Sequence, residues 1–186
     1  MIGLVGGKGV GKDTAARYLS ERYGAHQYAF ADPIKAYATA AFGLTHDQLH
    51  GTKAQKETPD PRYQLSPRQL MQRLGDGARA AFGDDFWIAR LLARLELEAP
   101  AIAVVSDVRF VNEAMRLRAV GCALWRLHYA PGLEPPCDPH ASEAEWPLPA
   151  VDLEIHPAYG LSELYAAMDQ ACRQLGIPLR DSASSR

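Results

Sequence analysis

The residues best suited to chemistry lie near the start of the chain, where glycines and lysines follow a short apolar run. Residues 2–5 are apolar and lead into Gly6-Gly7-Lys8-Gly9-Val10-Gly11-Lys12-Asp13-Thr14. A buried strand, a glycine-rich turn and a helix form the context in which the spacing G-x-x-x-x-G-K predicts phosphate binding. Turn N–H groups, the helix N-terminus and the Lys12 ammonium would hold the β- and γ-phosphates of a nucleoside triphosphate. The candidate triphosphate-binding residues are Gly7, Lys8, Gly9, Val10, Gly11, Lys12, Asp13 and Thr14.

One position in this motif departs from the usual pattern. The Ser or Thr whose hydroxyl normally ligates Mg²⁺ after the lysine is replaced by Asp13, and Thr14 follows one place later. Mg²⁺ prefers oxygen ligands, so Asp13 could hold the ion, or Thr14 could do so after a small shift.

A second candidate site lies on a helix predicted from the Ser66 cap to about Phe82. Pro67 fits its first turn. The residues expected on its buried side are Leu70, Leu74, Ala78 and Ala81. A separate stripe, roughly 60° wide at helical spacing, contains Arg68, Gln72, Gly75 and Arg79. Two guanidiniums and an amide suit a phosphate and a base edge, although a solvated helix face is the alternative.

A third candidate site follows the apolar run Ala101–Val105, which is typical of a central parallel strand. In open α/β sheets ligands bind beyond the carboxyl ends of the strands, which favours a role for Asp107 and Arg109. Asp107 could hold Mg²⁺ directly or through water, or could cap the helix predicted from about Phe110 to Ala119. Two residues in the first turn of that helix, Asn112 and Glu113, could reach the same crevice, although Glu113 could instead complement the helix dipole.

The remaining pattern predicts alternating strands and helices. Further strands are expected at Gln27–Phe30, Ala123–His128 and Val151–Ile155, and further helices at residues 12–23, 32–42, from 85 onward, and 162–175. Asp32 could be the N-cap of the second helix or a functional residue. Residues 44–66 predict a loop or mobile segment, and residues 129–149, rich in proline, predict a lid. The order favours one α/β domain over residues 1–180 with a mostly parallel five-stranded sheet, followed by a flexible tail at 181–186.

Composition narrows the class of protein. The 186 residues fit one domain, and 47% hydrophobic with 23% charged residues is ordinary for a soluble protein. A net charge of -2 gives no basic surface for long nucleic acids. Three separated cysteines and the lack of a long apolar run predict a cytoplasmic protein without a membrane span. His46 and His50 lack a third ligand nearby in the sequence, so we interpret them as solvated.

These motifs together resemble the bacteriophage-type deoxynucleoside monophosphate kinases. The resemblance covers about residues 1–175 and adds Phe30-Ala-Asp-Pro-Ile-Lys35, Asp85-Phe-Trp and His140-x-Ser-Glu143 to the motifs above. It implies Mg²⁺-dependent transfer of the γ-phosphoryl group of ATP to a deoxynucleoside 5′-monophosphate. It also implies a P-loop kinase core, a monophosphate-binding helical region at about residues 32–83, a lid at about 129–149, and often a homodimer.

The resemblance also suggests roles for single residues. On the acceptor side it places Asp32, Lys35, Arg68 and Arg79, and we add Gln72, Arg109, Asn112, Glu113 and His140 as candidate substrate contacts. The expected catalytic residues are Lys12, Asp32, Asp107, Arg109 and Arg126, and the expected Mg²⁺ ligands are Asp13, Thr14 and Asp107. Lids of related kinases usually bring an arginine, yet residues 129–151 contain none, so Arg126 or His140 is the predicted substitute.

Two other functions fit parts of the sequence. A dephospho-coenzyme A kinase or another small-molecule kinase would share the loop and the Asp-Val-Arg strand end. A nucleotide-gated module or ATPase would share the loop alone. Against a GTPase, the sequence contains no Asn-Lys-x-Asp motif, which reads guanine. Against a motor ATPase, no Glu follows Asp107 to orient an attacking water.

Overall fold

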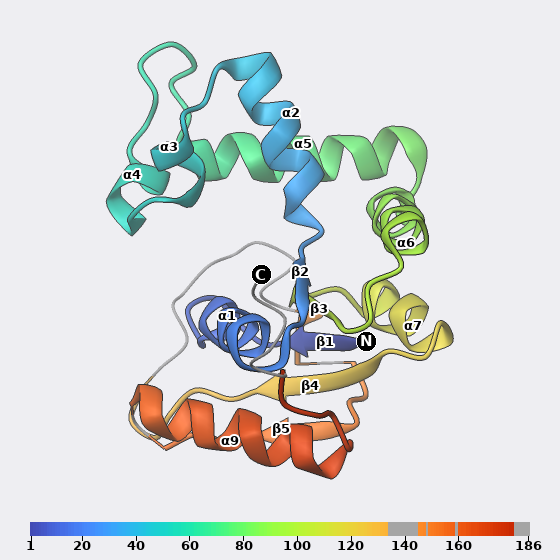
Figure 1. The fold of residues 1–186 in the computed structure, drawn as a ribbon. Coiled ribbons are helices and arrows are strands. Elements are labelled where there is room, and N and C mark those ends of the chain that lie inside the picture. The colour runs from blue at the N-terminus through green and yellow to red at the C-terminus, as the bar shows by residue number, and fades with distance from the viewer. Residues whose placement is uncertain (134–144, 148, 159, 181–186) are drawn as a thin grey trace, which may run out of the picture. The chain divides into compact units, whose positions relative to one another are not determined.

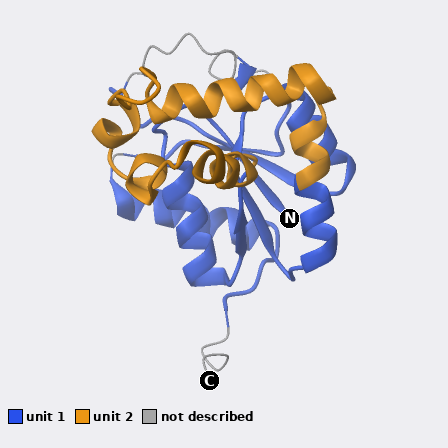
Figure 2. Cartoon of the chain, turned by 90° about the horizontal axis from the view of Figure 1, so that it is seen from above, with its two compact units in different colours: residues 1–29, 91–186 blue, residues 30–90 orange. Residues whose placement is uncertain are grey.

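The structure of the protein is a computed structural model that describes residues 1–133, 145–147, 149–158 and 160–180. The chain divides into two compact units, one formed by residues 1–29 and 91–186 and the other by residues 30–90 (Figure 2). The second unit spans the helical region that the sequence predicts at about residues 32–83. Most of the predicted lid, including His140, and the predicted tail at 181–186 lie outside the described residues.

The first unit contains a five-stranded parallel sheet with the order β2-β3-β1-β4-β5 (Figure 1). Its strands are β1 (Ile2–Val5), β2 (His26–Tyr28), β3 (Ala103–Val108), β4 (Ala123–Leu127) and β5 (Leu153–Ile155). This confirms the predicted α/β class and the mostly parallel five-stranded sheet. β3 continues through Ser106 and Asp107, which the sequence placed after the strand.

Helices cover both faces of this sheet. They are α1 (Lys12–Tyr23), α7 (Val111–Ala119) and α9 (Leu161–Gln174). Ile2 and Leu4 alternate toward one face and form the main core with residues of α1 and α9, including the fully buried Leu19 and Met168. The connection from β3 through α7 to β4 runs across the sheet in the direction opposite to the connection from β1 through α1 to β2. α7 therefore lies on the face opposite to α1, where it packs against β4 (Figure 1).

The strand order creates a natural ligand site at the carboxyl edge of the sheet. β1 and β3 are neighbours, but the connection after β1 leads through α1 to β2, whereas the connection after β3 leads through α7 to β4. The two connections therefore leave the sheet in opposite directions. Such a switch point is where open α/β sheets bind ligands.

The second unit is helical. It consists of α2 (Ala31–Phe42), α3 (His46–His50), α4 (Lys53–Glu57), α5 (Pro67–Phe82) and the start of α6 (Phe86–Glu98), which continues into the first unit. α2 packs on α5, and a small core contains Ala38, Leu44, Leu49 and Leu70. α2 begins one residue earlier than predicted, so Asp32 lies in its first turn and Phe30 occupies the N-cap position. Asp32 is therefore not the N-cap of this helix, which was one of the two alternatives that the sequence left open.

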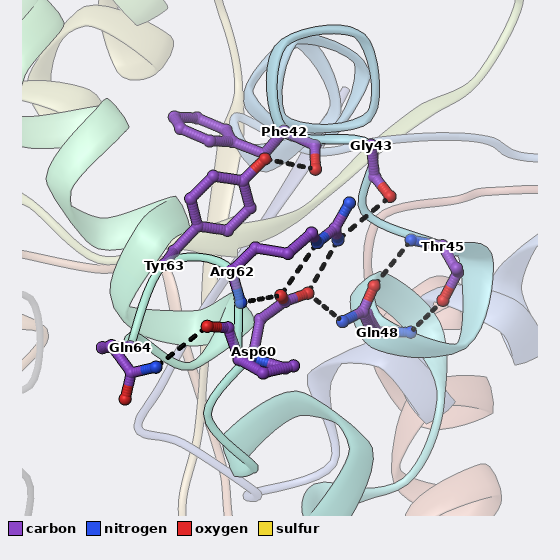
Figure 3. Close-up of polar contacts among 9 residues, drawn as sticks. Phe42, Gly43, Thr45, Gln48, Asp60, Arg62, Tyr63 and Gln64 are labelled. Atoms are coloured by element: carbon purple, nitrogen blue, oxygen red, sulfur yellow. Dashed lines mark hydrogen bonds and ion pairs between the residues drawn. The ribbon is translucent and has the colours of Figure 1, made fainter.

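The segment 44–66 is ordered rather than the predicted loop. Thr45 and Thr52 each begin a short helix through a capping box with the glutamine three residues later. The buried Asp60 then connects α3 to the chain after α4 through hydrogen bonds. Its carboxylate accepts hydrogen bonds from Arg62 Nε and Nη2 at 2.9 and 2.7 Å and from Gln48 Nε2 at 2.9 Å (Figure 3).

Within the described part of the chain, no helix has the length and apolar character needed to cross a membrane.

Candidate active site

The loop after β1 has the backbone geometry of a phosphate-binding turn. Gly11, the N-cap of α1, has a φ of 103°, a left-handed conformation that other residues adopt only with strain. Lys12 follows at the first position of α1, and its side chain is only 6% exposed. Its Nζ donates hydrogen bonds to the carbonyl oxygens of Gly6 at 2.6 Å and Gly7 at 2.7 Å. These bonds hold the ammonium against the loop.

The two candidate Mg²⁺ ligands of this loop lie in the first turn of α1. The side chain of Asp13 is exposed, and that of Thr14 is half-buried. A carboxylate at this position is also favoured by the positive end of the helix dipole. Both side chains therefore remain candidates.

The turn after β3 is fixed by a buried carboxylate. Glu113 is 3% exposed, and its Oε2 accepts hydrogen bonds from the N–H groups of Arg109 at 2.9 Å and Phe110 at 3.0 Å. The side chain of Asn112 accepts from the Glu113 N–H at 3.0 Å. The N-cap position of α7 is Phe110, so Asp107 does not cap this helix. Asp107 is half-buried in the last part of β3, at the switch point beside the loop of β1.

Three residues near the ends of the predicted lid segment contact this region, and the sequence did not single them out. Tyr129 Oη donates a hydrogen bond to the Lys8 carbonyl at 2.8 Å. A Cβ added to Gly7 would lie 2.4 Å from Tyr129 Oη and 3.0 Å from Trp146 Nε1. Glu145 accepts a hydrogen bond from the Val111 N–H at 3.4 Å. The signal in the sequence that could have indicated these contacts was the presence of Tyr129 and Trp146 in a segment rich in proline.

Arg126, a predicted catalytic residue, is held within the sheet. Its Nη1 forms an ion pair with Glu154 Oε1 at 2.8 Å, and its Nη2 donates to the Pro149 carbonyl. The side chain is 12% exposed. A role in phosphoryl transfer would require the guanidinium to reach a phosphate from this position.

In the second unit the stripe on α5 lies against other elements rather than in solvent. Gly75 is buried, and a Cβ added there would lie 3.4 Å from Ile34 Cδ1 of α2. Trp87 Nε1 donates to the Gly75 carbonyl at 3.0 Å. This close packing explains the glycine. Ala81, predicted on the buried side of α5, is exposed.

The polar residues of this stripe are half-buried, and its two arginines lie beside carboxylates. Arg68 Nε lies 3.3 Å from Glu57 Oε1, without hydrogen-bond geometry, and finds no hydrogen-bond partner among the residues that the structure describes. Arg79 Nη1 lies 3.3 Å from Asp76 Oδ1. The predicted site residues therefore divide between the units. The second unit contains Asp32, Lys35, Arg68, Gln72 and Arg79, and the first contains the others that the structure describes.

A glycine-rich loop with a buried lysine, next to the switch point of a parallel sheet, defines a phosphate-binding α/β protein of the P-loop class. Residues 1–61 match the family model described as "Deoxynucleotide monophosphate kinase". The chain is 39% identical over 158 residues to a protein of Acanthamoeba polyphaga mimivirus whose name places it among the deoxynucleotide monophosphate kinases. That match covers 78% of this chain and 81% of the viral protein.

The chain belongs to the deoxynucleotide monophosphate kinase family and is a phosphotransferase that acts on nucleotides. Among solved structures, an unliganded sugar kinase from Janibacter sp. HTCC2649 aligns with 95% of this chain and 94% of its own. The TM-score is 0.43 and the identity 15%, a likeness that adds nothing to the sheet order described above.

Proposed function

We propose that the enzyme transfers the γ-phosphoryl group of ATP to a deoxynucleoside 5′-monophosphate and releases ADP and the deoxynucleoside diphosphate. The observation that carries this proposal is the buried Lys12 ammonium, held at the loop of β1 beside the end of β3. Family membership supplies the acceptor class.

On the donor side, Lys12 and the loop from Gly7 to Thr14 bind the triphosphate. The hydrogen bonds that Lys12 makes to two loop carbonyls keep its charge where the β- and γ-phosphates would lie. Tyr129 supports the same loop through the Lys8 carbonyl.

The donor set near this loop fits Mg²⁺. Asp13, Thr14 and Asp107 offer hard oxygen ligands, and Asp107 lies at the end of the strand next to β1. When bound, the ion would neutralise charge that develops on the phosphoryl oxygens.

On the acceptor side, Lys35, Arg68 and Arg79 supply positive charge for the monophosphate, and Asp32 and Gln72 supply groups for the sugar or base. Arg68 and Arg79 are half-buried and lie on one stripe of α5, where guanidiniums can bind a phosphate through two parallel hydrogen bonds. Arg109 and Asn112, at the switch point, would complete the substrate contacts, and Glu113 would act by fixing the backbone at Arg109.

Catalysis in this proposal is positioning and charge stabilisation. Phosphoryl transfer through a loose transition state needs positive charge around three equatorial oxygens and in-line alignment, with little covalent work from the protein. Lys12 and Arg109 supply this charge. Arg126 would add to it only by releasing Glu154.

The test is a coupled ADP-release assay with ATP, Mg²⁺ and each deoxynucleoside monophosphate in turn. We expect ADP release that requires one or more of these acceptors and stops with excess EDTA. Transfer to dephospho-coenzyme A but to no nucleotide, or equal ADP release without an acceptor, would overturn the proposal.

A further inference from the structure

One face of the paired strands β4 and β5 carries a block of four polar side chains at their carboxyl ends. Arg126 pairs with Glu154, and the N–H of His128 donates to the Ile155 carbonyl at 2.9 Å, so the same register continues to His156. Residues two apart on a strand project from the same face. The fold therefore places His128 beside Glu154, which is 26 residues further along the chain, and beside His156.

The ring and carboxylate atoms of this block converge. His128 Nε2 lies 2.6 Å from Glu154 Oε2, and the rings of His128 and His156 stack with centroids 4.0 Å apart at an angle of 11°. One ligand atom from each of the three residues lies within 4.8 Å of the others. His128 is half-buried, and the other two side chains are exposed.

We propose that His128, Glu154 and His156 form a binding site for Zn²⁺. Two imidazoles and one carboxylate are a known zinc donor set, in which the fourth position is open to water. Bonds of about 2.0–2.2 Å place tetrahedral ligand atoms about 3.3 Å apart. The His128 and Glu154 atoms are 2.6 Å apart, and all three ligand atoms lie within 4.8 Å of one another. Rotation of the two histidine rings out of their stack would let all three atoms bind one ion.

Arg126 is the positioning residue for this site. It binds Glu154 through Oε1, which leaves Oε2 directed at His128. Outer contacts of this kind orient metal-binding carboxylates. Two neutral imidazoles favour a borderline ion such as Zn²⁺ over Mg²⁺, which prefers an all-oxygen shell.

A second stacked histidine pair provides an internal comparison. The rings of His46 and His50 have centroids 4.7 Å apart, and the carboxylate of Asp47 lies 3.9 Å from His46 Nδ1. Within the described residues, the block on β4 and β5 is the one group of three whose ligand atoms converge. Stacking alone therefore does not define the proposed site.

The experiment is calorimetric titration of Zn²⁺ into the metal-stripped full chain in millimolar Mg²⁺. We expect one equivalent to bind to the wild type. H156A and the double variant H128A/H156A should lower the Zn²⁺ affinity by more than about 100-fold. Loss of a residue that only contacts a metal ligand lowers the affinity by about 10–100-fold, so the larger loss would mark direct ligands. The matched control H46A/H50A should bind as the wild type does.

Co²⁺ absorption of the wild type gives a second readout that needs no variant. Four-coordinate Co²⁺ with nitrogen and oxygen ligands absorbs visible light far more strongly than the octahedral aqueous ion, and Zn²⁺ should displace this signal. No binding by the wild type, an octahedral Co²⁺ spectrum, or equal Zn²⁺ affinity in H128A/H156A would overturn the proposal.

Discussion

At the residue scale, the proposed chemistry depends on where the Lys12 ammonium is held. Lys12 is buried and makes two short hydrogen bonds to carbonyls of the loop that it follows. A cation fixed in this way acts on phosphate charge without first having to be ordered, which is the basis of electrostatic preorganisation.

Replacing this ammonium should remove most of the activity. We expect K12A to lower kcat/KM for ATP by at least about 100-fold, the scale for losing one preorganised donor to a transition state. The coupled assay measures this loss, and circular dichroism checks that the fold persists. K53A, on the short helix α4, is a control lysine outside the proposed site. Turnover of K12A equal to that of the wild type would refute the assigned role.

Gly7 has no room for a side chain, because Tyr129 lies close to its Cα. A Cβ there would meet Tyr129 Oη at 2.4 Å, and that hydroxyl is the donor to the Lys8 carbonyl. G7A should therefore displace Tyr129 and weaken nucleotide binding, at the cost of about 1–3 kcal/mol typical of overpacking.

A double-mutant cycle isolates this contact. Y129F removes the hydroxyl, so G7A should cost less in that background than in the wild type. The measurement is the dissociation constant of ATP for the four proteins. Strictly additive effects would show that Gly7 and Tyr129 act independently.

At the element scale, α5 presents its two stripe arginines in half-buried positions, whereas Arg73 of the same helix is exposed. R68A should lower kcat/KM for the monophosphate by about 10–100-fold, equivalent to the 1.5–3 kcal/mol of a hydrogen bond to a charged group. R73A should leave it nearly unchanged. The KM for ATP should stay close to the wild-type value in both. An effect of R68A confined to ATP would contradict the acceptor role of the stripe.

The segment between α2 and α5 depends on one carboxylate. Hydrogen bonds from Arg62, and then from Gln48, hold the pKa of Asp60 well below its usual range. A depressed folded-state pKa means that this contribution to stability is present above the unfolded pKa of about 3.9 and is lost as the pH falls below it.

D60N should consequently be less stable than the wild type at neutral pH, and the difference should shrink below about pH 4. Urea unfolding of both proteins across this pH range measures the effect. A difference that stays constant to low pH would show that the charge of Asp60 is not what stabilises the segment.

How far the sequence predicts this fold depends on how local each signal is. The strand, loop and α1 were predicted correctly because their apolar run, glycines and lysine are contiguous. The two short helices at 46–57 were missed although Thr45 with Gln48, and Thr52 with Gln55, carry the capping-box spacing. Polar composition and prolines outweighed that signal.

Contacts between distant segments could not be predicted in the same way. The bond from Tyr129 to Lys8 and the convergence of His128 with Glu154 both depend on the pairing and register of β1, β4 and β5. No spacing along the chain encodes that register. The sequence predicted the buried strand before Asp107 from its apolar run but ended it at Val105, and the structure has Asp107 within the last part of β3.

At the scale of the whole molecule, the proposed functions are distributed over the two units. The triphosphate loop and the end of β3 belong to the unit of residues 1–29 and 91–186, and the arginine stripe belongs to residues 30–90. The proposal therefore predicts that each substrate, given alone, stabilises a different set of residues.

Hydrogen exchange can measure this division on the full chain. A ligand that binds only the folded state at 100 times its Kd adds about 2.7 kcal/mol of stability to what it binds. A non-hydrolysable ATP analogue with Mg²⁺ should slow exchange most in peptides covering residues 6–16, whereas the accepted monophosphate should slow it most in peptides of α2 and α5. R68A should remove the second pattern and keep the first. A monophosphate that protects the loop at 6–14 and leaves residues 30–90 unchanged would show that the acceptor is bound elsewhere, since a phosphate held by Arg68 and Arg79 should slow exchange in α5.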